Sequence, residues 1–228
     1  EEYKNDQFIN KYQIIGNPNK LDVAQETEVN ENLLEEQFLS VAIFTSDIND
    51  KIAFHYTHDY TEKFLKACFI AIGKVQETSG KSFKVCIKLK EERHKNWFDN
   101  HTALNELVRR HNISLTVDHN KKYDTRDLIS SSNSVISIGF TTPGFDALCL
   151  KKNSIYFTPY RGVYNSIFDK TPSLVANTVE DLVRFLSKGF DHNAFESKRG
   201  NIIGYDKDEV AGTRLRYLIE DDLAIVRH

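Results

Sequence analysis

The feature that most constrains the fold is an alternation of short apolar runs with stretches of helical period, from about Leu39 to Gly189. Apolar runs bounded by turn residues are typical of buried strands, and apolar residues recurring every three to four positions are typical of helices. Strands that alternate with helices form β-α-β units in a sheet covered on both faces. The sequence therefore predicts an α/β fold with a doubly wound, Rossmann-like parallel sheet. The expected strands are LSVAIFTSD (39–47), FKVCIKLK (83–90), ISLTV (113–117), SVISIG (134–139) and SIYFTPY (154–160).

Start and stop signals mark several of the expected helices. Asp59 and Glu62 have the spacing of a capping box, and Gly80 is a natural stop for the helix that follows them. The stretch TVEDLVRFLSKG (178–189) repeats both signals. The remaining helices are expected at residues 91–112, 125–132, 142–152 and about 209–223.

Composition and patterning suggest one large domain preceded by a connector. With 228 residues, of which 40% are apolar, the chain can bury a substantial core. Residues 1–38 combine a short β-like run, YQIIG, with an acidic amphipathic stretch, and they are predicted to form an N-terminal connector. Residues 39–228 are predicted to form the α/β domain. Because the sequence lacks methionine, even as an initiator, we expect a piece of a longer protein.

Charge, cysteine content and hydropathy exclude several classes of partner. The 30 basic and 33 acidic residues are spread evenly, so no basic stripe indicates nucleic-acid binding. The three cysteines lie far apart without a CxxC motif or a Cys/His cluster, which favours buried thiols in a reducing cytoplasm over disulfides or a metal site. No apolar window has the length of a membrane span. We therefore expect a cytoplasmic protein without a bound metal.

The exit of the fourth strand, GFTTPGFDAL, has the chemistry of an anion site. Thr142 is the expected N-cap and Pro143 the first helical residue, and Gly144 would let a ligand approach the backbone. Free N–H groups at a helix N-terminus bind phosphate, and the hydroxyls of Thr141 and Thr142 are further donors. Asp146 is a candidate acceptor for ribose hydroxyls. The same residues also suit an ordinary helix start, and the local pattern leaves both interpretations open.

Other strand exits carry further candidates, because ligands of doubly wound sheets bind outside the carboxyl ends of the strands where the strand order reverses. Ser46 and Asp47 follow the first strand, where turn residues are also common for structural reasons. Lys88 and Lys90 near the end of the second strand would balance phosphate charge, although a solvated helix face explains them equally well. Arg161 follows the fifth strand.

Three absent motifs narrow the enzyme class. The sequence has no GxGxxG after the first strand, no Gly-Lys-Ser/Thr loop and no GxSxG elbow. These absences argue against a dinucleotide-dependent dehydrogenase, a P-loop nucleotidase and an α/β-hydrolase. The eight histidines are scattered. Each is interpreted as a surface residue in preference to a catalytic base.

The run RDLISSSNSVISIGFTTPGFDALCLKKNSIYF (126–157) resembles the C-terminal, donor-binding half of GT-B glycosyltransferases, above all those of bacterial surface-polysaccharide biosynthesis. Residues 172–186 are similar to the segment after the fifth strand and the helix that follows it in that group, and the resemblance is specific over about 124–186. The residues that carry it are Asp127, Leu128, Gly139, Thr141, Thr142, Gly144, Asp146, Leu150 and Lys152.

The resemblance implies a nucleotide-sugar donor with its phosphates against Thr141, Thr142 and Gly144 and its ribose near Asp146. It also implies a glycan acceptor, an N-terminal acceptor domain that supplies the catalytic base, no metal or other cofactor, and peripheral attachment to the inner membrane in some members. Two features of the family are missing. Ile138 stands eight residues before Asp146, where retaining members carry a glutamate, and KLKEERH replaces Lys-Pro-His-Pro after the second strand.

Three alternatives to the glycosyltransferase remain open at this point. A nucleotide-sugar 2-epimerase shares the two-domain architecture, and a polyol-phosphate transferase shares the donor half. A non-catalytic scaffold would keep the fold without the chemistry. An isolated donor half is itself expected to bind its donor but to transfer slowly or not at all.

Overall fold

The computed structural model describes residues 38–51, 57–119, 122–139, 141–150, 152–160 and 175–188. The predicted connector, apart from its last residue, and the helix predicted near 209–223 lie outside these residues. Arg161 also lies outside them.

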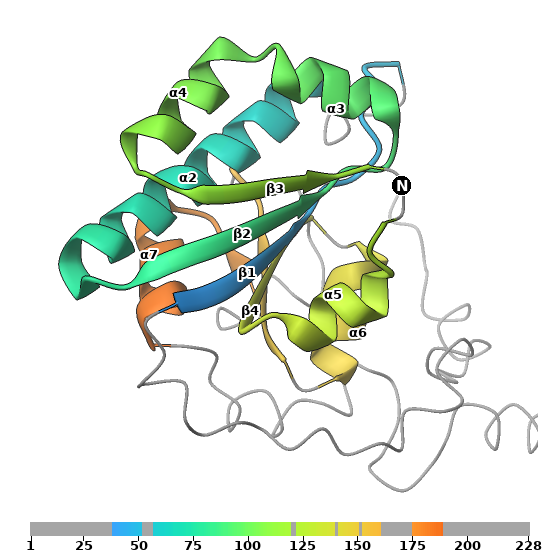
Figure 1. The fold of residues 1–228 in the computed structure, drawn as a ribbon. Helices are drawn as coiled ribbons and strands as arrows, with labels where there is room; N and C mark the ends of the chain where they lie inside the picture. Colours follow the sequence, from blue (N-terminus) through green and yellow to red (C-terminus); the bar gives the residue numbers. More distant parts are fainter. Residues whose placement is uncertain are drawn as a thin grey trace, which may run out of the picture. The chain divides into compact units, whose positions relative to one another are not determined.

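Among the described residues, six parallel strands form one sheet (Figure 1). Their order is β3-β2-β1-β4-β5-β6, which confirms the predicted doubly wound α/β architecture. The order reverses between β1 and β4, the neighbours that form the topological switch point. The strands are β1 (Phe38–Phe44), β2 (Ser82–Lys88), β3 (Ser114–Asp118), β4 (Ser134–Ile138), β5 (Asn153–Phe157) and β6 (Val175–Ala176).

Helices cover both faces of this sheet (Figure 1). On one face lie α2 (His58–Ser79), α4 (Thr102–Arg110) and α7 (Val179–Lys188), and α3 (Glu92–Asp99) leads into α4. On the other face lie α5 (Thr125–Ser131) and α6 (Thr142–Cys149). Because both faces are covered, central strands have no solvent side, and all five residues of β4 are buried. This burial explains why β4 is mostly apolar, whereas β2 and β3 alternate between more buried and more exposed residues.

Three local predictions need correction. The single helix expected at residues 91–112 is two helices, because α3 ends at Asn100 and the imidazole of His101 caps α4 by accepting from the N–H of Leu104 at 3.4 Å. The capping box predicted at Asp59 is wrong, since Thr57 is the N-cap of α2 and accepts from the N–H of Tyr60 at 3.2 Å. Strand β6 was not predicted, because two residues are too few to show a period.

The predicted cap of α7 is present. The Thr178 hydroxyl accepts from the N–H of Asp181 at 3.1 Å, and the Asp181 carboxylate accepts from the N–H of Thr178 at 3.2 Å. Replacing Thr178 with alanine should therefore lower the free energy of unfolding by about 1 kcal/mol, measured by urea unfolding. Thr102→Ala, at the start of a helix that His101 caps, is the matched control. Equal losses in the two variants would contradict the capping role.

Candidate functional site

A pocket of about 390 Å³ lies at the carboxyl ends of the central strands, at the switch point. Its walls come from the ends of β1 and β2, the residue after β3, and the N-termini of α5 and α6. Five predicted site residues meet there although they are far apart in the sequence: Ser46, Lys88, Lys90, Thr141 and Thr142. The other lining residues are Phe44, Thr45, Leu89, His119, Thr125 and Pro143.

The N-terminus of α6 forms one wall of this pocket. Thr141 is its N-cap and Thr142 its first helical residue, so the predicted N-cap at Thr142 is off by one position. The side chain of Thr141 makes no capping hydrogen bond at this helix end. Its first N–H groups are therefore available to a ligand, and the helix dipole makes that end attractive to an anion.

Two residues that line the pocket have side-chain hydroxyls that are buried without a partner among the described residues. They are Oγ of Ser46, a residue that is only 6% exposed, and Oγ1 of Thr141. A buried polar atom without a hydrogen bond costs free energy, so such atoms require an explanation. A polar ligand in the pocket would supply the missing partners.

Two glycines shape the turn and helix beside these hydroxyls. Gly139 follows β4 with φ 47°, a left-handed conformation that favours glycine, and its N–H donates to the carbonyl of Phe157 at 3.3 Å. Gly144 packs against the sheet instead of lining the pocket. A Cβ atom there would lie 2.4 Å from the ring of Tyr156 and 2.9 Å from Ser137. Close packing of α6 on β4 and β5 thus accounts for this glycine without ligand approach.

Lys88 lines the pocket, but its ammonium group is already paired. Its Nζ lies 2.8 Å from Oδ2 of Asp118, whose side chain is 2% exposed, and it also donates to the carbonyl of Tyr123. Burial favours the neutral acid of Asp118, but the hydrogen bond and charge of Lys88 outweigh it, and backbone N–H donors add to them. The pKa of Asp118 therefore lies below its usual range. Lys90, by contrast, is exposed and has no ion-pair partner among the described residues.

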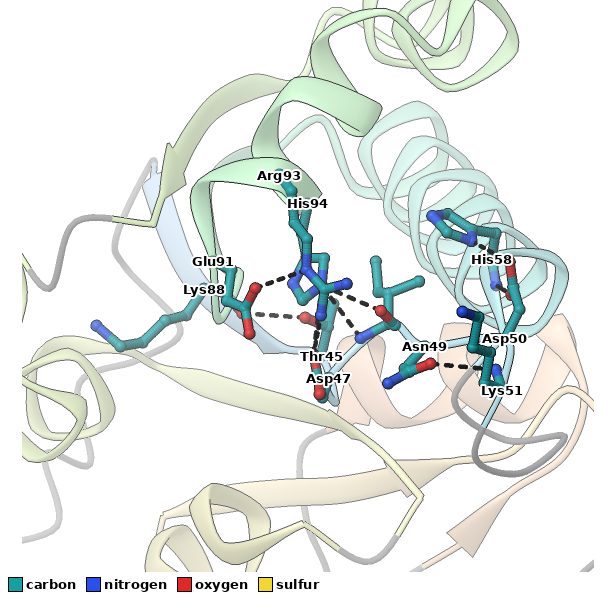
Figure 2. Close-up of polar contacts among 11 residues, drawn as sticks. Thr45, Asp47, Asn49, Asp50, Lys51, His58, Lys88, Glu91, Arg93 and His94 are labelled. Carbon is teal, nitrogen blue, oxygen red and sulfur yellow. Dashed lines mark hydrogen bonds and ion pairs between the residues drawn. The ribbon is translucent and has the colours of Figure 1, made fainter.

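Asp47 faces α3 (Figure 2). Its Oδ1 lies 3.3 Å from Nη2 of Arg93 and 3.3 Å from Nε2 of His94. Arg93 also donates from Nε to Glu91 at 2.6 Å. His94 is only 1% exposed, so its interpretation as a surface histidine was wrong. Burial, followed by the charge of Arg93, lowers the pKa of His94 below its ordinary value.

The predicted set of site residues omits six lining residues, of which Phe44 and Thr45 directly precede Ser46. His119 and Thr125 flank the exit of β3, and Leu89 and Pro143 adjoin residues that were predicted. Applying the strand-exit rule to the third strand as well would have found His119. Asp146 lies in α6 outside the set of lining residues. Within the described ranges, no group of three or more His, Cys, Asp or Glu residues could hold a metal ion.

Comparison with known proteins gives one family. Residues 23–186 match the family model described as polysaccharide biosynthesis PFTS motif protein, which is most of the chain. The chain matches no curated protein. No helix in the described part of the chain is long and apolar enough to cross a membrane.

Proposed function

Because this chain belongs to the family of polysaccharide biosynthesis PFTS motif proteins, we propose that it takes part in polysaccharide synthesis as the donor-binding domain of a glycosyltransferase. In this proposal the switch-point pocket holds the phosphate groups of a nucleotide-activated sugar. Family membership supports the role in polysaccharide biosynthesis, and the chemistry of the pocket supports the kind of ligand.

The observation that carries the proposal is that one pocket is lined both by the N-terminus of α6, which the Thr141 side chain does not cap, and by two residues whose buried hydroxyls have no partner among the described residues. Hydroxyl and backbone N–H groups are donors, and phosphate oxygens accept several hydrogen bonds at once. The pocket also lies where ligands of doubly wound sheets bind. A phosphate group satisfies all three features, whereas an apolar ligand would leave the donors unpaired.

In this mechanism, the chain stabilises the leaving phosphate. When the sugar–phosphate bond breaks, negative charge grows on the departing phosphate oxygens, and fixed donors aimed at them lower the barrier. Thr141, Thr142 and Ser46 would supply hydroxyl donors, and Lys90 would supply a positive charge at the mouth of the pocket. In this proposal, an N-terminal acceptor domain binds the acceptor glycan and supplies the catalytic base.

Calorimetric titration of the 228-residue chain with UDP, CMP, CDP and GDP tests the proposal. We expect saturable binding of one nucleotide, weakened about tenfold in Thr142→Val, because valine keeps the shape but loses the hydroxyl donor. Thr102→Val is the matched control, since Thr102 is the first residue of α4 as Thr142 is of α6. Its affinity should equal that of the native chain.

Failure of all four nucleotides to bind a folded chain would contradict the proposal, and a scaffold role would then explain the family membership better. Equal weakening by Thr142→Val and Thr102→Val would place the nucleotide outside this pocket. Circular dichroism of each variant shows whether it is folded.

A further inference from the structure

The loop after β1, residues 45–51, is tied by side chains to two helices (Figure 2). At its far end, Asp50 accepts from the backbone N–H of His58 at 2.8 Å and lies 2.7 Å from Nδ1 of the same residue. Thr45 begins the loop, and its hydroxyl donates to the carbonyl of Lys88 at 3.2 Å. The middle of the loop meets His94 of α3.

The imidazole of His94 contacts this loop through Nε2. That nitrogen lies 3.2 Å from the carbonyl oxygen of Ile48 and 3.3 Å from Oδ1 of Asp47, and the backbone N–H of Ile48 points to it as a donor from 3.4 Å. The two oxygens are the nearer partners, and one of them is a carboxylate. These distances favour the tautomer that carries its proton on Nε2 and donates it to the loop.

The other ring nitrogen of His94 keeps the side chain neutral. Nδ1 is buried and has no hydrogen-bond partner among the described residues, so a second proton would be a buried N–H without an acceptor. The charged groups that act on the ring are Arg93, which opposes protonation, and Asp47 and Glu91, which favour it. Burial and Arg93 prevail, and the pKa of His94 is lowered.

Ser46 lies between two fixed points of this loop. On one side, the N–H and hydroxyl of Thr45 bond to the carbonyl of Lys88 at 3.4 and 3.2 Å. On the other side, two residues later, Ile48 contacts His94. Ser46 lines the pocket, and its hydroxyl is buried without a partner among the described residues. Its position therefore depends on the loop being held at both points.

We propose that His94 is a positioning residue of the pocket: as a neutral donor from α3 it holds loop 45–51 in place and so keeps the Ser46 hydroxyl in the site. The ligand-binding consequence rests on the proposed function, whereas the anchoring of the loop does not. His94 touches no ligand in this role and acts through Ser46.

Hydrogen exchange of the 228-residue chain, followed by mass spectrometry, tests the anchoring. His94→Ala should reduce the protection of amides in residues 45–51 about tenfold relative to the native chain. His94→Gln should keep most of that protection at pH 8, because its side-chain amide can donate where Nε2 does. His101→Gln is the matched control, since His101 also pairs with a carboxylate, Glu62 at 3.2 Å, and caps a different helix.

The pH profile separates this role from general support of the fold. In the native chain, protection of residues 45–51 should fall between pH 7 and pH 5, because protonation of His94 places an N–H where no acceptor lies among the described residues. His94→Gln cannot titrate, and its profile over this range should be flat. A native profile retained in His94→Gln, or loop protection in His94→Ala no lower than in His101→Gln, would overturn the proposal.

Titration with UDP, CMP, CDP and GDP completes the test. If the native chain binds one of them, His94→Ala should bind it about tenfold more weakly and His94→Gln nearly as well as the native chain. Equal affinity in the native chain and His94→Ala would overturn the link to Ser46. If the native chain binds none, the proposed function fails, while the exchange data still decide whether His94 anchors the loop.

Discussion

Replacing Lys88 with methionine should lower the free energy of unfolding by about 3 kcal/mol, because it leaves a buried carboxylate without its counter-charge. Nζ of Lys88 lies 2.8 Å from Oδ2 of Asp118, and the two side chains are 16% and 2% exposed. Methionine keeps most of the aliphatic packing and removes only the charge and its hydrogen bonds. Urea unfolding at pH 7, followed by circular dichroism, measures the loss.

A second lysine–aspartate pair of similar geometry provides the control. Nζ of Lys63 lies 3.0 Å from Oδ2 of Asp59, but these side chains are 48% and 60% exposed. Water screens such a pair, so Lys63→Met should cost much less than Lys88→Met. The double variant Lys88→Met/Asp118→Leu should recover most of the loss, because it removes the buried charge itself. Similar losses in Lys88→Met and Lys63→Met would show that burial of the first pair does not matter.

The same pair gives a pH dependence with a definite sign. The pKa of Asp118 is lowered in the folded chain, so its contribution is complete above the unfolded value of about 3.9 and is lost as the pH falls below it. In Lys88→Met the hydrogen bond and charge that most lower the pKa of Asp118 are gone. Burial then dominates, and the pKa of Asp118 should rise. The variant should therefore lose less stability than the native chain in acid. The difference in unfolding free energy between the two should shrink as the pH falls through about 4.

Most of the fold could be predicted from the sequence because the physical signals are local. A strand covered on both faces is mostly apolar, and β4 shows this with five buried residues in a row, all apolar except Ser134 and Ser137. Gly80 could be assigned as the stop of α2 because its φ of 69° needs a residue without a side-chain penalty. The break between α3 and α4 was missed because His101 is an uncommon cap, although Asp99 and Asn100 before it are turn-favouring residues.

The site was predictable in part, for a similar reason. Parallel strands bring their carboxyl ends to one edge, so Ser46, Lys88 and Thr141 could be grouped from strand order alone. Sequence does not say which way a side chain turns at that edge. Asp47 faces Arg93, and the ammonium of Lys88 faces Asp118. The backbone of Gly144 packs against Tyr156. The orientation of these groups depends on contacts with residues that are distant in the sequence.

Gly144→Ala should lower the free energy of unfolding by about 1 kcal/mol, although alanine is the better helix former. Helix propensity alone favours the variant by about 1 kcal/mol. The new methyl group, however, would lie 2.4 Å from Cε1 of Tyr156 and 2.9 Å from Ser137, and overpacking of this kind costs about 1–3 kcal/mol. The ring of Tyr156 is 2% exposed and has little room to move. To relieve the clash, α6 must shift away from the sheet. Urea unfolding measures the loss.

That shift should also weaken nucleotide binding about tenfold in the calorimetric assay, because the N-terminus of α6 is a wall of the pocket. Gly80→Ala separates the two effects. A Cβ there meets nothing within 4 Å, so only its left-handed backbone should cost about 1 kcal/mol. Gly80 lies just before β2, at the amino ends of the strands and therefore opposite the pocket. Nucleotide affinity should not change in Gly80→Ala. If Gly144→Ala instead stabilised the chain and still abolished binding, packing would not explain this glycine, and close approach of the ligand to the backbone would.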